Sequence, residues 1–157
     1  VGHLCLRKQV EQKLRDSEQK LELILHYTND GISMTEYAPP THGRRLLFCN
    51  DRYVEMSGRS LEELMAADDL NAFVTVSESH EHLQHQHEAR LCGESTEGMA
   101  SWVRPDGAEN YFEWKAVPIR MGDTICHVGV DRDTTERRRS ERALQEREET
   151  LDLILRV

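Results

Sequence analysis

The chain has 157 residues, of which 38% are hydrophobic and 31% are charged, and its formal net charge is −9. This length has room for one domain with one hydrophobic core and for additional helices. The acidic balance argues against a nucleic-acid partner and against contact with an anionic membrane surface, because both require a concentration of basic residues.

The cysteines and the hydropathy pattern indicate a cytoplasmic setting. Cys5, Cys49, Cys92 and Cys126 have no C-x-x-C spacing, and we expect them to be reduced thiols. No apolar run approaches the length of a membrane span, and no signal peptide opens the chain. Because the first residue is Val1 rather than Met, we interpret the chain as a segment of a longer protein.

Residues 1–27 are predicted to form an N-terminal amphipathic helix. Val10, Leu14, Leu21 and Ile24 follow heptad-like spacing that polar residues interrupt twice. Such a helix either lies on its own domain or pairs with a second copy in a parallel dimer. We favour the dimer, because the same imperfect spacing returns near the C-terminus.

The middle of the chain alternates short strands with short helices. A capping box at 60–63 starts one of the helices, Gly58 ends the helix before it, and Pro105-Asp106-Gly107 forms a turn. This order predicts an α+β domain with one antiparallel sheet. The expected strands are 32–37, 45–49, 97–104, 110–119 and 124–131. The expected helical segments are one that starts at 50–51 and stops at Gly58, a short one that opens at 60, one turn at 68–73, and a helix at 80–91.

The alternation of side chains predicts which face of the last two strands is apolar. Phe112, Trp114 and Ala116 share one face of their strand. In the last strand Cys126, Val128 and Val130 have the apolar parity, which leaves His127 on the other face.

The last strand is expected to enter a C-terminal helix, residues 134–157, without a flexible linker. Asp133 is a suitable N-cap, and Glu136 can complete a capping box with it. A junction of this kind passes movement of the strand into the helix, whereas a Gly/Ser linker would absorb it. We therefore expect a signalling module.

The two terminal helices also form an internal repeat. Residues 144, 148, 151, 153, 154 and 155 match the residue types found 130 positions earlier. A run of matches at one constant offset indicates a repeated unit, so the chain is interpreted as one unit plus the first helix of the next.

Three segments of this sequence resemble a PAS domain. Residues 48–64, FCNDRYVEMSGRSLEEL, resemble the family's N-x-x-(F/Y)-x-x-(M/L)-(T/S)-G segment together with its following E-E-L. Pro105-Asp106-Gly107 resembles the K-D-G turn, and residues 128–137, VGVDRDTTER, resemble the G-x-x-x-D-I-T-E-R end motif with Thr134 in place of Ile. The PAS domain would then span residues 28–133.

The resemblance implies a five-stranded antiparallel sheet with short helices that close a pocket over one face. It also implies a regulatory sensor that acts as a homodimer and is coupled to a neighbouring PAS domain or to an output domain, such as a histidine kinase or a diguanylate cyclase. Asp133 and Thr135 match the D-x-T positions that hold the outgoing helix, and with Glu136 they form the expected relay junction. Flavin-binding photosensors of the family carry a reactive cysteine box that Gly58-Arg59-Ser60-Leu61 lacks, so a photoreactive flavin is not expected.

Four histidines on the predicted helix 80–91 raise the question of a metal or haem. His82 and His85 are neighbours at i and i+3, and the resemblance places His82 near the iron ligand of haem-binding relatives. Leu83, His87 and Leu91 form a more natural inward row, which makes His87 a candidate for the pocket wall. The alternative is a solvated, His-rich helix, and we expect no metal here.

A ligand pocket between sheet and helices would draw on residues that are otherwise plain core. No nucleophile, base and orienting group can be assembled, so this segment is not expected to be an enzyme. Three functions stay open: a sensor that binds an unidentified small molecule or cofactor, a haem-binding sensor, and a ligand-free dimerisation and relay module. The pocket candidates are Met34, Phe48, Tyr53, Met56, Phe73, Leu83, His87, Trp102, Trp114 and Val128.

Overall fold

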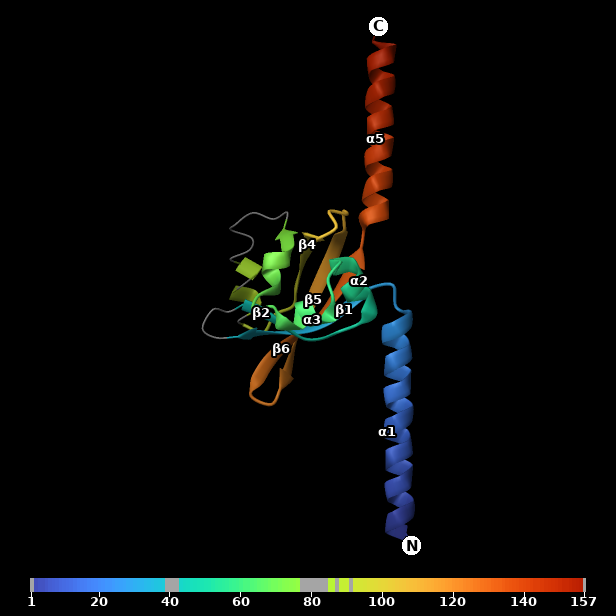
Figure 1. Ribbon diagram of the computed structural model, residues 1–157, viewed down its shortest axis with the longest axis vertical. Helices are drawn as coiled ribbons and strands as arrows, with labels where there is room; N and C mark the ends of the chain where they lie inside the picture. Colours follow the sequence, from blue (N-terminus) through green and yellow to red (C-terminus); the bar gives the residue numbers. More distant parts are fainter. Residues whose placement is uncertain (1, 39–42, 77–84, 87, 91, 157) are drawn as a thin grey trace.

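The computed structural model describes residues 2–38, 43–76, 85–86, 88–90 and 92–156. A domain built on one sheet lies between two long helices, α1 (Gly2–Tyr27) and α5 (Thr135–Leu155). The two helices leave the domain in opposite directions, so the termini lie at the two ends of the molecule (Figure 1).

The sheet has six strands in the order β2-β1-β6-β5-β4-β3, and every neighbouring pair is antiparallel. The α+β class and all five expected strands are confirmed. The sixth strand was missed because β3 has three residues, too few to show a period-2 pattern. The strands are β1 (Gly31–Ala38), β2 (Gly43–Cys49), β3 (Val74–Val76), β4 (Thr96–Trp102), β5 (Tyr111–Met121) and β6 (Thr124–Asp133).

Short helices with side-chain caps connect β2 to β3. They are α2 (Asp51–Ser57), α3 (Leu61–Ala66) and the 3₁₀ helix η1 (Leu70–Phe73). Gly58 ends α2 at φ 66°, a left-handed conformation that glycine adopts without strain. The predicted capping box is confirmed, because the Ser60 hydroxyl accepts from the Glu63 backbone and the Glu63 carboxylate accepts from the Ser60 backbone.

The hydrophobic core lies between these helices and the inner face of the sheet. Tyr53 and Met56 of α2 and Leu64 of α3 are almost completely buried. The ring of Tyr53 meets the Trp102 ring edge to face, with 5.2 Å between the ring centroids. This core packs α2 against β1 and α3 against β2.

The terminal helices add nothing to this core. In α1, described over Gly2–Tyr27, no residue is buried, and in the described range of α5 only Thr135 is buried. Leu14 and Leu21 of α1 and Leu144 and Leu151 of α5 are each more than half exposed. The alternative in which α1 covers its own domain is therefore wrong, and the apolar seams of both helices are open to a partner.

Candidate functional site

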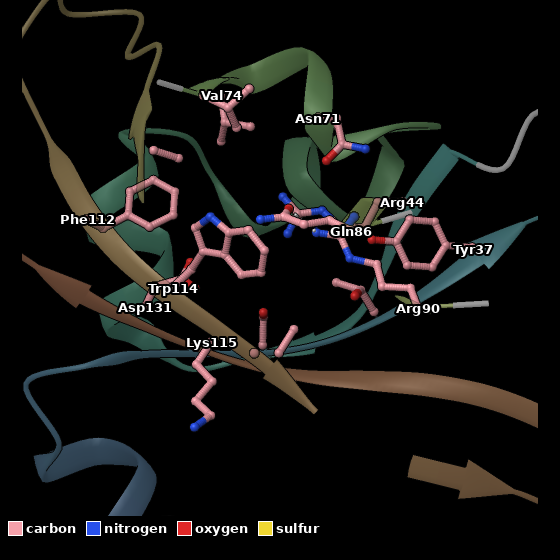
Figure 2. A pocket seen from close by; sticks show the side chains of 16 residues that line it. Tyr37, Arg44, Asn71, Val74, Gln86, Arg90, Phe112, Trp114, Lys115 and Asp131 are labelled. Carbon is pink, nitrogen blue, oxygen red and sulfur yellow. Dashed lines mark hydrogen bonds between the residues drawn. The ribbon is translucent and has the colours of Figure 1, made fainter. Parts of the chain in front are cut away.

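A cavity of about 310 Å³ lies on the inner face of the sheet (Figure 2). This volume is at the lower end of the range for small-molecule sites and corresponds to about ten water molecules. Its lining comes from every described strand, from η1 and from the helical residues Gln86 and Arg90. The lining residues are Ser33, Thr35, Tyr37, Arg44, Asn71, Val74, Val76, Gln86, Arg90, Ala100, Phe112, Trp114, Lys115, Ala116, Gly129 and Asp131.

Arg90 closes one side of the cavity through contacts with its neighbours. Its guanidinium lies over the rings of Trp114 and Tyr37, 5.2 and 5.7 Å from their centroids. It also donates to the Thr96 hydroxyl at 3.3 Å and to the Gln86 side-chain oxygen at 3.4 Å. These contacts hold Arg90 as part of the wall.

Two opposite charges, Arg44 on β2 and Asp131 on β6, reach the same cavity. Asp131 is 5% exposed, and burial raises the pKa of its carboxyl to about 7, with Arg44 opposing the rise and Asp30 adding to it. Neither residue was among the pocket residues predicted from the sequence. A signal was available for Asp131, because a carboxylate stands there within an apolar strand.

Several sequence-predicted pocket residues belong to the core beside the cavity. Tyr53, Met56 and Trp102 are at most 4% exposed and pack in the core cluster. Phe73 is partly buried under the Arg59 guanidinium, which lies 4.1 Å from the ring centroid. Of the predicted candidates that the structure describes, Trp114 is the one that lines the cavity.

Three of the predicted pocket residues face away from the cavity. Phe48 is 43% exposed. Met34 and Val128 are directly opposite each other in register, and they alternate with Ser33 and Gly129, which line the cavity. The prediction that these three side chains face the cavity is therefore wrong. In β6 the apolar side chains such as Val128 point to the outer face of the sheet, and Gly129 and Asp131 lie on the inner face.

The histidine predictions fall partly outside the described residues. His82, Leu83 and His87 lie outside them, whereas His85 is described and exposed. Among the described residues no group of three or more His, Cys, Asp or Glu is arranged to hold a metal ion.

The described lining also does not suit haem. A haem macrocycle presents broad apolar faces, and here it would meet Arg44, Gln86, Arg90 and Asp131. A small polar molecule suits these residues better, because each of them can supply a hydrogen bond or a charge.

The junction between β6 and α5 is a network of short hydrogen bonds. Asp133 is the last residue of β6, and only Thr134 separates it from α5. The Asp133 carboxylate accepts from the Thr135 hydroxyl at 2.6 Å and from the Thr135 backbone N–H at 2.9 Å. Thr135 in turn accepts from the Tyr111 N–H at 3.0 Å, and the Thr134 N–H donates to the Tyr111 carbonyl at 2.8 Å. These bonds fix the start of α5 to β5.

The predicted capping box of Asp133 and Glu136 is wrong in detail. The N-cap residue is Thr134, and Glu136 is exposed and has no hydrogen bond to Asp133 among the described contacts. The Asp133 carboxylate is instead shared by Thr135, Asn110 and Arg52, at 2.6 to 3.0 Å. Tertiary partners have replaced the local cap. The junction without slack is nevertheless present.

The incoming helix is attached at the same corner of the domain. The Asn50 side-chain amide donates to the carbonyls of Leu25 in α1 and Asp30 at 3.1 and 3.0 Å, and its oxygen accepts from Ile32 N–H at 2.8 Å. Arg52 then bridges the Asn29 carbonyl and the Asp133 carboxylate. The bases of both terminal helices are therefore connected through the start of α2.

The comparisons with known proteins agree with this architecture. The profile of the family described as PAS fold matches residues 40–139, and the chain belongs to this family. PAS domains are regulatory sensor modules that are common in signalling proteins such as histidine kinases. A search of curated proteins found no significant match.

Solved PAS and LOV structures share the fold at low sequence identity. A PAS domain of an HTR-like protein from Haloarcula marismortui is 17% identical, with 80% of this chain and 98% of that chain covered and a TM-score of 0.63. A PAS domain from a two-component sensor histidine kinase is 13% identical over 74% and 98% of the two chains, with a TM-score of 0.55. An RNA-binding light-oxygen-voltage receptor is 18% identical, with a TM-score of 0.64; the match covers 84% of this chain but only 37% of that receptor.

None of the helices in the described residues combines the length and the apolar character that a bilayer crossing needs.

Proposed function

We propose that this chain is the ligand-binding sensor module of a cytoplasmic signal-transduction protein. In this proposal a small molecule in the cavity changes the geometry of β6, and β6 moves α5. The observation that carries the proposal is the position of Asp131. It lines the cavity and lies two residues before Asp133 on the same strand, about 7 Å along the chain.

The relay would act through a homodimer. The seams of α1 and α5 are exposed, and the outgoing helix is fixed at its base by Asp133 and Thr135. A shift of β6 would then be passed along α5 to the output domain, for which we propose a histidine kinase or a diguanylate cyclase. A neighbouring PAS unit could be contacted through α1 in the same way, given the repeated helix sequence.

The ligand part is tested on freshly purified protein. Native mass spectrometry and an absorption spectrum would reveal a retained small molecule, and a Soret band would show haem. Hydrogen exchange at the Tyr111 amide, with and without a bound species, reports on the junction, because this N–H donates to Thr135. A cavity that binds nothing from a metabolite library would refute the sensor function.

A second candidate is a ligand-free dimerisation and relay module, favoured by the exposed seams on both terminal helices. Sedimentation over a concentration series tests it. Leu21→Asp should weaken the dimer, whereas Leu23→Asp should not, because Leu23 lies off the seam although the two residues are 57% and 56% exposed. A monomer at the highest concentration would exclude dimer formation by this chain alone.

A further inference from the structure

The carboxylate of Asp131 is buried at the cavity and has no hydrogen-bond partner among the described residues. The residue is 5% exposed, yet no described residue donates a hydrogen bond to its side chain. Its backbone is fixed in the β1–β6 and β5–β6 ladders, opposite Gly31 and Trp114. A carboxylate in this position is costly when ionised unless a cation or hydrogen-bond donors reach it.

Arg44 presents the complementary problem across the same cavity. Its Nε is fully buried, and among the described residues no acceptor is hydrogen-bonded to the guanidinium. Asp131 and Arg44 influence each other electrostatically, but the described ion pairs include none between them. Buried guanidinium groups are normally hydrogen-bonded. Among the described residues, however, the Arg44 guanidinium lacks an acceptor and the Asp131 carboxylate lacks a donor.

The rest of the lining can contact the uncharged part of a small molecule that lies between the two charges. Arg90 is occupied by Tyr37, Trp114, Thr96 and Gln86 and is therefore not the free anion site. Apolar contacts are available along Val74, Val76, Ala100, Phe112 and Trp114. Figure 2 shows Trp114, Arg44, Gln86 and Tyr37 directed toward one another around the cavity.

We infer that the cavity binds a small zwitterion, an α-amino acid or a close analogue, with its carboxylate on Arg44 and its ammonium group on Asp131. This inference rests on the proposed ligand-binding function of the cavity and names the ligand class. One molecule would then satisfy the Asp131 carboxylate and the Arg44 guanidinium together, and no direct ion pair between the two competes with it. The carboxylate can accept two parallel N–H bonds from the guanidinium, and the ammonium group donates to Asp131.

The test uses the whole 157-residue chain, purified and dialysed, in isothermal titration calorimetry with the common L-amino acids. At least one should bind. For each one that binds, the N-acetyl derivative, which lacks the positive charge, and the decarboxylated amine, which lacks the negative charge, should bind at least about tenfold more weakly. Equal binding of either analogue would overturn the inference. This comparison uses the unaltered protein and does not depend on the folding of a variant.

Two variants with matched controls assign the two ends of the ligand. Asp131→Asn and Arg44→Gln should each weaken binding by at least about tenfold. Asp123→Asn and Arg45→Gln change the same residue types at exposed positions and should leave it unchanged. If the two cavity variants bind as tightly as the unaltered chain, the assignment is wrong.

The pH dependence provides an independent readout. In the ligand-free protein the pKa of Asp131 is raised to about 7, so its ionised fraction rises about tenfold from pH 6 to pH 8. The affinity for a ligand with an ammonium group should rise with it. Asp131→Asn should remove this dependence. Affinity that falls over this range would refute the assigned orientation.

The failure of this inference can be told apart from failure of the proposed function. If a compound that is not a zwitterion copurifies in the cavity, or is selected from a metabolite library, the sensor function stands and the inferred ligand class is wrong. If neither amino acids nor any library compound binds, both are wrong.

Discussion

Replacing Asp131 by Asn should stabilise the free protein, and should do so more at high pH than at low pH. The two side chains have nearly the same shape, but Asn cannot ionise. In the unaltered protein the pKa of Asp131 rises from 3.8 to about 7, chiefly because the group is buried. The contribution of this carboxyl to the free energy of unfolding is therefore fully present below about pH 4 and is lost as the pH rises through about 7.

The magnitude follows from the two pKa values. The difference between the two pKa values lowers the free energy of unfolding by about 4 kcal/mol at pH 8 and by about 1.5 kcal/mol at pH 5, relative to a side chain that does not ionise, at about 1.4 kcal/mol for each tenfold change in the ionisation constant. Water that enters the cavity would reduce both figures. The advantage of Asp131→Asn should therefore grow by about 2 kcal/mol between pH 5 and pH 8.

Urea unfolding followed by tryptophan fluorescence measures this difference, at constant ionic strength and at a protein concentration with a single oligomeric state. Asp123→Asn, at an exposed turn position, is the matched control and should follow the unaltered chain at both pH values. Parallel pH profiles for Asp131→Asn and the unaltered chain would show that the folded state does not hold Asp131 as a buried, unpartnered carboxyl.

Three further predictions concern the junction and α2. Thr135→Val should lower the free energy of unfolding by about 2 kcal/mol and speed hydrogen exchange of the Tyr111 amide, which donates to the Thr135 hydroxyl. Thr150→Val is the control and should change little, because the Thr150 hydroxyl donates only to the Glu146 carbonyl of its own exposed helix. Gly58→Ala should lower the unfolding free energy by about 1–2 kcal/mol and by more than Gly122→Ala, because both glycines have positive φ but a Cβ at 58 would lie 3.0 Å from the Arg104 guanidinium. Arg52→Gln should cost less than about 1 kcal/mol, because the ion pair is partly exposed, yet raise the pKa of Asp133 measured by NMR, since the Arg52 charge helps to lower it. Equal costs within either matched pair, or an unchanged Asp133 titration, would contradict these assignments.

Local patterns determined much of the architecture. The capping box at Ser60 and Glu63 needs residues three apart, and the left-handed end of α2 at Gly58 depends on one residue type, so both could be predicted without tertiary contacts. The same holds for the five longer strands, whose period-2 patterns are local. A three-residue edge strand such as β3 carries no comparable signal, because its pairing with β4 defines it.

The candidate site was decided by the tertiary structure. Hydrophobic parity assigned Val128 to the inner face of β6, but the fold turns Gly129 and Asp131 inward, where Asp131 meets a cavity that Arg44 reaches from β2. A pattern of apolar residues predicts which face of a strand is buried in a core. Where the inner face of the sheet lines a polar cavity, polar residues such as Asp131 lie on that face instead. Likewise Asp133, a local cap by sequence, is shared by Arg52, Asn110 and Thr135, because partners up to 81 residues away converge on it.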